Sequence, residues 1–128
     1  MNKKYSVDEV LSKVIFKNSM KRAEASVEFD GDMIKMNAEN YILFANKGVK
    51  CVKCGIEGIY FRKIRHTRVK EAHLCHFNLY ALDKNGNEVL MTKDHIIPKS
   101  KGGRSKQSNY QVMCKICNEE KSDEETTK

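Results

Sequence analysis

The chain has 128 residues, enough for one domain with one modest hydrophobic core. Its 24 basic and 17 acidic side chains give a net charge of +7, which suits a polyanionic partner. No apolar run approaches the about 18 residues of a membrane-spanning helix, and no apolar segment of a secretory signal follows the first residues. We therefore expect a protein that does not span a membrane and that lies in the cytoplasm or on the nucleoid.

The N-terminal third carries the signals of a helix, a hairpin and a second helix. A capping-box pattern precedes apolar residues at helical spacing, which predicts a helix over residues 7–18. An Asp-Gly turn signal between two short apolar runs predicts a hairpin over residues 25–36. A second short helix is expected to begin within residues 37–40 and to end at Gly48, because glycine commonly terminates helices.

Residues 47–128 are predicted to form the main domain, on which residues 1–46 pack as a small helix/hairpin extension in one compact unit. Runs with strand-like composition alternate there with turn signals, of which Asn85-Gly86 is the strongest. A polar stretch with helical character follows near the end of the chain. These patterns predict an α+β fold, with strands over residues 59–64, 72–82 and 88–97 and a helix over residues 115–124.

Four of the five cysteines form two pairs, with two residues between the members of each pair. In a chain without a secretory signal, this spacing favours a metal site over disulfides. Two thiolates three positions apart can reach one tetrahedral ion, and a second pair completes a structural zinc site without an open position. The predicted zinc ligands are Cys51, Cys54, Cys114 and Cys117.

The fifth cysteine, Cys75, has His73 and His76 close to it in the second predicted strand. We favour Cys75 as a small buried hydrophobic residue and the histidines as ordinary packing or surface residues. A His/Cys/His metal site is an alternative, although neighbouring strand positions point apart. The sequence alone leaves the role of these three residues open.

Asp94 and His95 are adjacent at the point where an apolar run gives way to a polar loop. Neighbouring side chains of a strand point to opposite faces, and the end of a strand can aim both at one site from different sides. Pro98 ends the strand, because proline has no N–H for the ladder. The loop that follows is rich in Gly and Ser and carries basic but no acidic side chains. This strand end is our candidate active site.

The order of these elements resembles the HNH (ββα-metal) endonuclease family, in its zinc-stapled form, over residues 51–121. The third letter of the family name is usually a histidine, and Asn118 stands in its place. Many members of the family carry Asn there, so the difference exchanges one metal ligand for another. The matching elements are Cys51/Cys54, the Asp94-His95-Ile96-Ile97-Pro98 strand, Gly102-Gly103, Asn109, Cys114/Cys117, Asn118 and Lys121.

The resemblance implies a ββα-metal nuclease core that hydrolyses phosphodiester bonds of DNA and leaves 5′-phosphate and 3′-hydroxyl ends. His95 would act as the general base that takes a proton from water. Asp94 and Asn118 would hold Mg2+ or another divalent cation through hard oxygen ligands. Asn109 would hydrogen-bond across the loop and hold the His95 strand in register.

Basic side chains supply candidate DNA contacts in two places. One group lies in the loop after the predicted active-site strand and in the final helix, and the other lies at the end of the strand predicted over residues 59–64 and in the connection after it. Contacts of this kind bind phosphates without reading the sequence. The candidates are Lys99, Lys101, Arg104, Lys106 and Lys121 in the first group and Arg62, Arg65 and Arg68 in the second.

A non-catalytic zinc-ribbon module that binds nucleic acid is the alternative function. It explains the cysteines and the charge, but not Asp94-His95 together with an asparagine beside a zinc ligand. Small members of the family serve as homing, restriction, repair or phage-encoded nucleases. The sequence does not choose among these roles, does not reveal a target sequence, and does not distinguish a monomer from a homodimer or nicking from double-strand cleavage.

Overall fold

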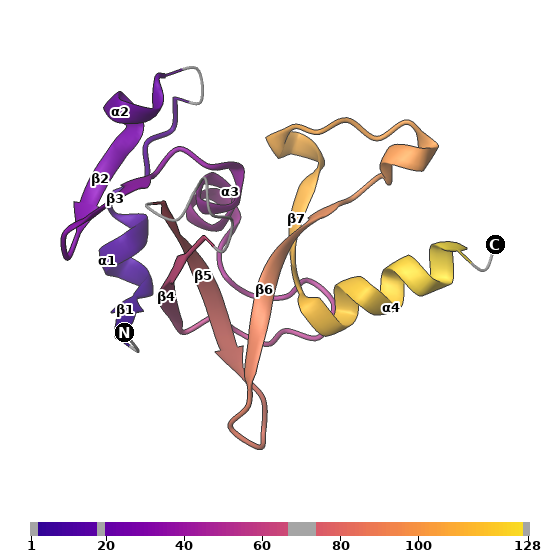
Figure 1. Cartoon of the computed structure of the whole chain (residues 1–128). Helices are drawn as coiled ribbons and strands as arrows, with labels where there is room; N and C mark the ends of the chain where they lie inside the picture. Colours follow the sequence, from indigo (N-terminus) through magenta and orange to yellow (C-terminus); the bar gives the residue numbers. More distant parts are fainter. Residues whose placement is uncertain (1–2, 18–19, 67–73, 127–128) are drawn as a thin grey trace.

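The computed structural model describes residues 3–17, 20–66 and 74–126. The fold combines a five-stranded antiparallel sheet with a separate two-stranded hairpin and helices (Figure 1). This combination confirms the predicted α+β class. The large sheet has the order β1-β4-β5-β6-β7, with β1 (Lys4–Ser6), β4 (Tyr60–Arg65), β5 (Cys75–Leu82), β6 (Glu88–His95) and β7 (Tyr110–Cys114). The hairpin consists of β2 (Ser26–Phe29) and β3 (Asp32–Lys35), and the helices are α1 (Val7–Leu11), α2 (Arg22–Ala25), α3 (Glu39–Lys47) and α4 (Lys115–Thr126), with short turns η2 (Lys99–Lys101) and η3 (Gln107–Asn109).

Strand β6 changes its partner along its length. Residues 88–90 pair with residues 80–82 of β5, and residues 91–95 pair with residues 110–114 of β7. The second half of β6 therefore leaves β5 and continues with β7 alone, which Figure 1 shows as an orange pair of strands extending from the rest of the sheet. Asp94 and His95 lie at the far end of this pair.

Helices α3 and α4 lie on opposite faces of β6. Asn118 of α4 donates a hydrogen bond from Nδ2 to Thr92 Oγ1 at 2.8 Å. Lys93, the next residue of the strand, instead donates from Nζ to Glu39 Oε1 of α3 at 2.9 Å. Successive side chains of a strand point to opposite faces, so these contacts place one helix on each face. Side chains of both helices can therefore contact the end of β6, each from its own face of the strand.

The core is built around aromatic side chains contributed by both parts of the chain. Phe61 and Phe77, on neighbouring strands of the large sheet, have ring centroids 5.8 Å apart. Phe29 of the hairpin lies edge-on to Phe77 at 4.8 Å, and Tyr5 of β1 lies edge-on to it at 5.1 Å. Edge-to-face packing of this kind adds to the free energy gained by burying the rings. The hairpin is thereby packed on the sheet.

The first helix is shorter than the sequence predicts. Ser6 caps it through a hydrogen bond from the Glu9 N–H, as the capping-box pattern indicates, but the helix ends at Leu11. The Ile15 N–H donates to Met36 O at the end of the hairpin at 3.0 Å instead of continuing the helix. Tertiary pairing with the hairpin therefore overrides the helical spacing of Val14 and Ile15, and the prediction of a helix to residue 18 is wrong. The strand β1 and the short helix α2 were not predicted.

The other elements agree with the sequence apart from their ends. The hairpin turns at Asp30 and Gly31, both with positive φ, which is the geometry that an Asp-Gly turn favours. Helix α3 ends before Gly48, whose φ is +91°. Strand β6 ends at His95, two residues earlier than predicted, and α4 runs to Thr126.

The division of the chain at residues 46 and 47 stays a prediction. Strand β1 of the N-terminal part pairs with β4, so it is an edge strand of the large sheet. Within the described ranges, no helix is long and apolar enough to cross a membrane.

Candidate active site and metal centre

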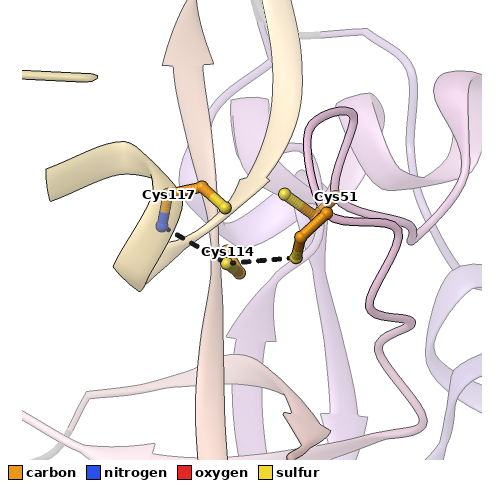
Figure 2. Close-up of side chains that lie close together, drawn as sticks. Cys51, Cys114 and Cys117 are labelled. Atoms are coloured by element: carbon orange, nitrogen blue, oxygen red, sulfur yellow. Dashed lines mark hydrogen bonds between the residues drawn. The ribbon is translucent and has the colours of Figure 1, made fainter. Parts of the chain in front are cut away.

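The four cysteines predicted to bind zinc lie together at the junction of the large sheet and α4. Cys51 and Cys54 come from the loop between α3 and β4, and Cys114 and Cys117 come from the end of β7 and the start of α4 (Figure 2). All four Sγ atoms lie within 4.8 Å of one another. The Sγ atoms of Cys54 and Cys114 are 3.8 Å apart, which is about the edge of a tetrahedron with Zn–S bonds of about 2.3 Å. The four cysteines are therefore positioned to hold one metal ion such as zinc.

The thiols of this cluster differ in how readily they ionise. Burial opposes ionisation of Cys51, but N–H groups of Cys54, Cys114 and Lys53 outweigh it and lower its pKa to about 6. Burial raises the pKa of Cys114, and burial together with hydrogen bonds to the neighbouring thiols raises the pKa of Cys117. A bound cation favours the thiolate form. The chemistry and the geometry of this donor set both suit a closed structural zinc site.

The structure brings three of the predicted catalytic residues, Asp94, His95 and Asn118, to one cavity, whose lining does not include Asn109. Asp94 is buried and His95 is half-buried, and they occupy the last two positions of β6. A cavity of about 290 Å³ lies at this strand end. Asp94 and Asn118 reach it from the face that α4 covers, and His95 reaches it from the strand end. Its lining includes Asp94, His95, Asn118, Lys121, Lys93 and Lys99.

Asp94 is held by two side chains that the sequence did not connect with it. Lys121 donates from Nζ to Asp94 Oδ2 at 2.7 Å and to His95 O at 2.6 Å. Gln111 of β7, which pairs with Asp94 in the β6–β7 register, donates to the same Oδ2 at 2.9 Å. The carboxylate and the Asn118 carboxamide are hard oxygen donors of the kind that Mg2+ accepts. A metal ion at Asp94 would have to share the carboxylate with the Lys121 ammonium or displace it.

His95 has two neighbours that restrict its imidazole ring. The Nε2 atom lies 3.1 Å from Ser105 Oγ, which belongs to the connection between β6 and β7. Tyr110, the partner of His95 in the β6–β7 register, places its ring edge-on at 5.1 Å between centroids. The contact of Ser105 with Nε2 and the packing of Tyr110 together restrict the orientation of the ring.

Asn109 ties the two ends of the connection between β6 and β7 together. Its Oδ1 accepts from the Ile97 N–H at 2.9 Å, and its Nδ2 donates to Ile97 O at 3.0 Å and to Arg104 O at 2.8 Å. The Asn109 carbonyl oxygen accepts from the Ile96 N–H at 2.8 Å. Gly103 packs against the same turn, where an added Cβ would lie 1.7 Å from Ile97 O. The asparagine and the glycine both fix the path of the chain directly after His95.

The cations of the β6–β7 connection are exposed, whereas the two described cations of the other candidate group, Arg62 and Arg65, form ion pairs. Lys99, Lys101, Arg104 and Lys106 are all exposed, and no ion pair between described residues involves them. In the second group, Arg62 pairs with Glu88 at 2.6 Å and Arg65 pairs with Asp32 at 3.1 Å, while Arg68 lies outside the described residues. The exposed group is therefore the better candidate for phosphate contacts.

Cys75 and its histidine neighbours do not form a cluster among the described residues. Cys75 is buried on the core face of β5, and His76 lies on the other face with its ring 4.9 Å from that of His66. Burial, followed by the charge of His66, lowers the pKa of His76. His73 lies outside the described residues, so the His/Cys/His alternative stays untested.

Residues 83–127 match a protein-family model described as HNH endonuclease. This segment of the chain is therefore similar to HNH endonucleases. A search of curated proteins and a search of solved structures each found no match to the chain. This match indicates a nuclease-type function with a nucleic-acid substrate.

The HNH segment contains Asp94, His95 and Asn118, together with the second cysteine pair. Cys51 and Cys54 lie outside it, so the metal centre joins the HNH segment to an earlier part of the chain. Sequence reasoning missed the contacts of Gln111 and Ser105. A register prediction for β6 and β7 could have found Gln111, because it faces Asp94 directly, but no local signal marks Ser105.

Proposed function

We propose that the chain is a metal-dependent DNA endonuclease in which His95 acts as general base. The observation that carries this proposal is the meeting of Asp94, His95 and Asn118 at one cavity inside an HNH-family segment. Exposed cations of the neighbouring β6–β7 connection support a polyanionic substrate. The products would be 5′-phosphate and 3′-hydroxyl ends, as in the family that the sequence resembles.

Each residue of the proposed site has a separate task. His95 would accept a proton from the attacking water, which requires an unprotonated imidazole nitrogen facing the cavity. Asp94 and Asn118 would hold Mg2+ or a similar cation, and Asn109 would hold the strand end in place through its contacts to Ile97. A divalent cation bound there would polarise the phosphate and stabilise the leaving oxygen.

The four-cysteine centre is proposed to be a structural zinc site. Four thiolates fill a tetrahedral ion and leave no position for a water nucleophile. Asn118 directly follows the ligand Cys117 at the start of α4, so zinc would fix the part of the helix that presents Asn118 to the cavity. The zinc would support catalysis by positioning this helix and would not take part in the reaction.

The test is digestion of supercoiled and linear DNA with Mg2+, followed by mapping of the ends, for the wild type and His95→Ala. Loss of a general base should reduce cleavage by about 10²- to 10⁴-fold while DNA binding is retained. His76→Ala is the matched control, because it removes an imidazole that does not line the cavity. Its cleavage rate should equal that of the wild type.

Two results would contradict the proposal in different ways. A His95→Ala variant that cleaves at the wild-type rate would exclude His95 as the base. A folded wild type that binds DNA but does not cleave it with any divalent cation would favour the non-catalytic zinc-ribbon module instead.

A further inference from the structure

Tyr110 links the end of β6 to helix α3, on the face opposite to α4. Its side chain is fully buried, and its ring lies edge-on to the His95 imidazole with 5.1 Å between centroids. Its hydroxyl donates a hydrogen bond to Glu39 Oε2, in the first turn of α3, at 2.8 Å. One aromatic side chain therefore contacts both the proposed general base and a carboxylate from the N-terminal part of the chain.

Glu39 is held as an ionised acceptor in this position. The Lys93 ammonium donates to Glu39 Oε1 at 2.9 Å and also lies 4.3 Å from the centroid of the Tyr110 ring. This contact lowers the pKa of Glu39 against the opposing effect of burial, and the Tyr110 hydrogen bond lowers it further. A carboxylate has only acceptor sites, so Tyr110 must be the donor in the bond between them.

The direction of that bond fixes the direction of the bonds that follow. Because the Tyr110 proton is committed to Glu39, only the oxygen lone pairs of its hydroxyl can interact with Ser105, a neighbour that lowers the pKa of Tyr110 against the larger effect of burial. The Ser105 Oγ atom lies 3.1 Å from His95 Nε2, so it can accept from that nitrogen when its own proton is turned toward Tyr110. In that arrangement neutral His95 carries its proton on Nε2, and the lone pair of Nδ1 is left for water.

We propose that Glu39 is a positioning residue for His95, which acts by anchoring Tyr110 and, through Tyr110 and Ser105, by fixing the orientation and tautomer of the imidazole. This inference rests on the proposed function, because it assigns His95 as the base. Glu39 lies outside the HNH segment of residues 83–127. The N-terminal part of the chain therefore completes the active site from the face of β6 that α4 does not reach.

The test compares Glu39→Gln and Tyr110→Phe with Tyr60→Phe. Tyr60 is a matched control, because it is also a buried tyrosine and its hydroxyl donates to a glutamate, Glu88. Glu88 is paired with a cation, Arg62, just as Glu39 is paired with Lys93. Tyr60 does not line the cavity. Glu39→Gln and Tyr110→Phe should lower kcat by about tenfold or more with KM unchanged. Tyr60→Phe should leave both constants unchanged.

Ser105 supplies a variant pair whose folding is not in question, because the side chain is exposed. Ser105→Ala should lower kcat, and Ser105→Thr, which keeps the hydroxyl, should restore it. A second readout needs no cleavage. Imidazole ¹⁵N shifts of His95 at one alkaline pH, assigned with His95→Ala, should show the Nε2–H tautomer in the wild type and a mixture of tautomers in Tyr110→Phe and Glu39→Gln.

The outcomes separate this inference from the proposed function. If His95→Ala loses cleavage but Glu39→Gln and Tyr110→Phe retain the wild-type kcat and tautomer, the positioning role is wrong and the nuclease proposal stands. If the wild type does not cleave DNA, the tautomer measurement still decides whether Glu39 positions His95. If Tyr60→Phe loses as much kcat as Glu39→Gln and Tyr110→Phe, general destabilisation of the protein explains the losses, and the inference is overturned.

Discussion

Asp94 is the residue on which the candidate site depends most, because its carboxylate is buried beside a cation. The ammonium of Lys121 and the amide of Gln111 both donate to Oδ2. A buried carboxylate that loses its cation bears an uncompensated charge, which costs much more than an exposed charge does. Lys121 thus stabilises Asp94 in the position from which it would hold a metal ion, and the two cations would compete for one carboxylate.

Replacing Lys121 by methionine should expose this competition. Without Mg2+ the variant should lose about 1–3 kcal/mol of unfolding free energy, because Asp94 loses a charged hydrogen bond. Added Mg2+ should stabilise the variant more than the wild type, because the ion would replace the ammonium. Urea unfolding with and without Mg2+ measures both effects. Lys115→Met, on an exposed position of the same helix, is the control, and equal stabilisation of all three proteins by Mg2+ would contradict the competition.

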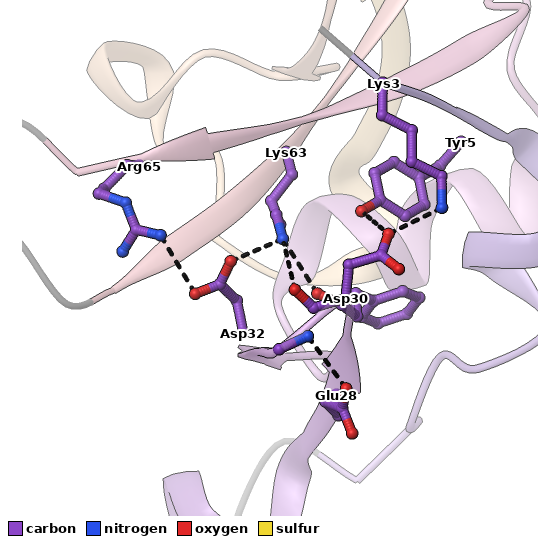
Figure 3. A network of polar contacts seen from close by, with 9 residues as sticks. Lys3, Tyr5, Glu28, Asp30, Asp32, Lys63 and Arg65 are labelled. Atoms are coloured by element: carbon purple, nitrogen blue, oxygen red, sulfur yellow. Dashed lines mark hydrogen bonds and ion pairs between the residues drawn. The ribbon is translucent and has the colours of Figure 1, made fainter. Parts of the chain in front are cut away.

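At the scale of elements, the β2–β3 hairpin is attached to the large sheet by ion pairs as well as by aromatic packing. Asp30, at the turn, pairs at 2.7 Å with Lys3, which directly precedes β1 (Figure 3). Asp30 also accepts a hydrogen bond from the hydroxyl of Tyr5, which belongs to β1. Asp32, at the start of β3, pairs with Lys63 of β4 at 2.6 Å and with Arg65. Both carboxylates therefore connect the hairpin to strands of the large sheet.

These pairs should make the stability of the protein depend on pH in acid. Hydrogen bonds from Lys63 and then Arg65 lower the pKa of Asp32 below its ordinary value of 3.8. The contribution is complete above the pKa of the unfolded chain and disappears as the pH falls through the lower pKa of the folded protein. Asp32→Asn should therefore lower Tm at pH 7, and the difference from the wild type should shrink below pH 3.8.

Thermal unfolding between neutral and strongly acidic pH measures this difference. Asp8→Asn is the control, because Asp8 is an exposed carboxylate of α1. A Tm difference for Asp32→Asn that stays constant down to the lowest pH would show that the ion pairs do not attach the hairpin.

At the scale of the whole molecule, the cysteine cluster joins two parts of the chain that are far apart in sequence. It connects the loop before β4 with the end of β7 and the start of α4. From the loop with Cys51 and Cys54 the chain runs into β4, and it comes back to the cluster at the end of β7. Structural zinc in small peptides contributes about 10–16 kcal/mol, so a zinc ion here would stabilise the sheet and α4 together.

The zinc and the catalytic cation should therefore be separable. Brief EDTA treatment should stop cleavage without lowering Tm, and Mg2+ should restore it, because a closed four-thiolate site exchanges its ion slowly. Cys51→Ser and Cys117→Ser should lower zinc content and Tm together. Asn118→Ala should keep full zinc and lose Mg2+-dependent cleavage, although it adjoins Cys117. Elemental analysis beside cleavage rates is the measurement, and loss of zinc in Asn118→Ala would refute its assignment to the catalytic cation.

The features that the sequence determined are those encoded in short stretches of chain. The spacing of the cysteine pairs predicts a shared ion, and the Asp-Gly signal predicts the hairpin turn, because both depend on local geometry. Adjacent Asp94 and His95 at a strand end likewise predict a site reached from two faces. Alternating burial along β5 follows from the strand period.

The tertiary structure decided the features that depend on contacts between distant residues. Helix α1 ends at Leu11 because the backbone of Ile15 pairs with Met36, which overrides helical spacing. Tyr110 and Glu39 are 71 positions apart, and Lys121 and Asp94 are 27 apart. No local pattern encodes such pairs, since they form only when β6 is placed between α3 and α4. The candidate site residues were therefore predicted from local sequence patterns, whereas the partners that hold them in position were set by packing.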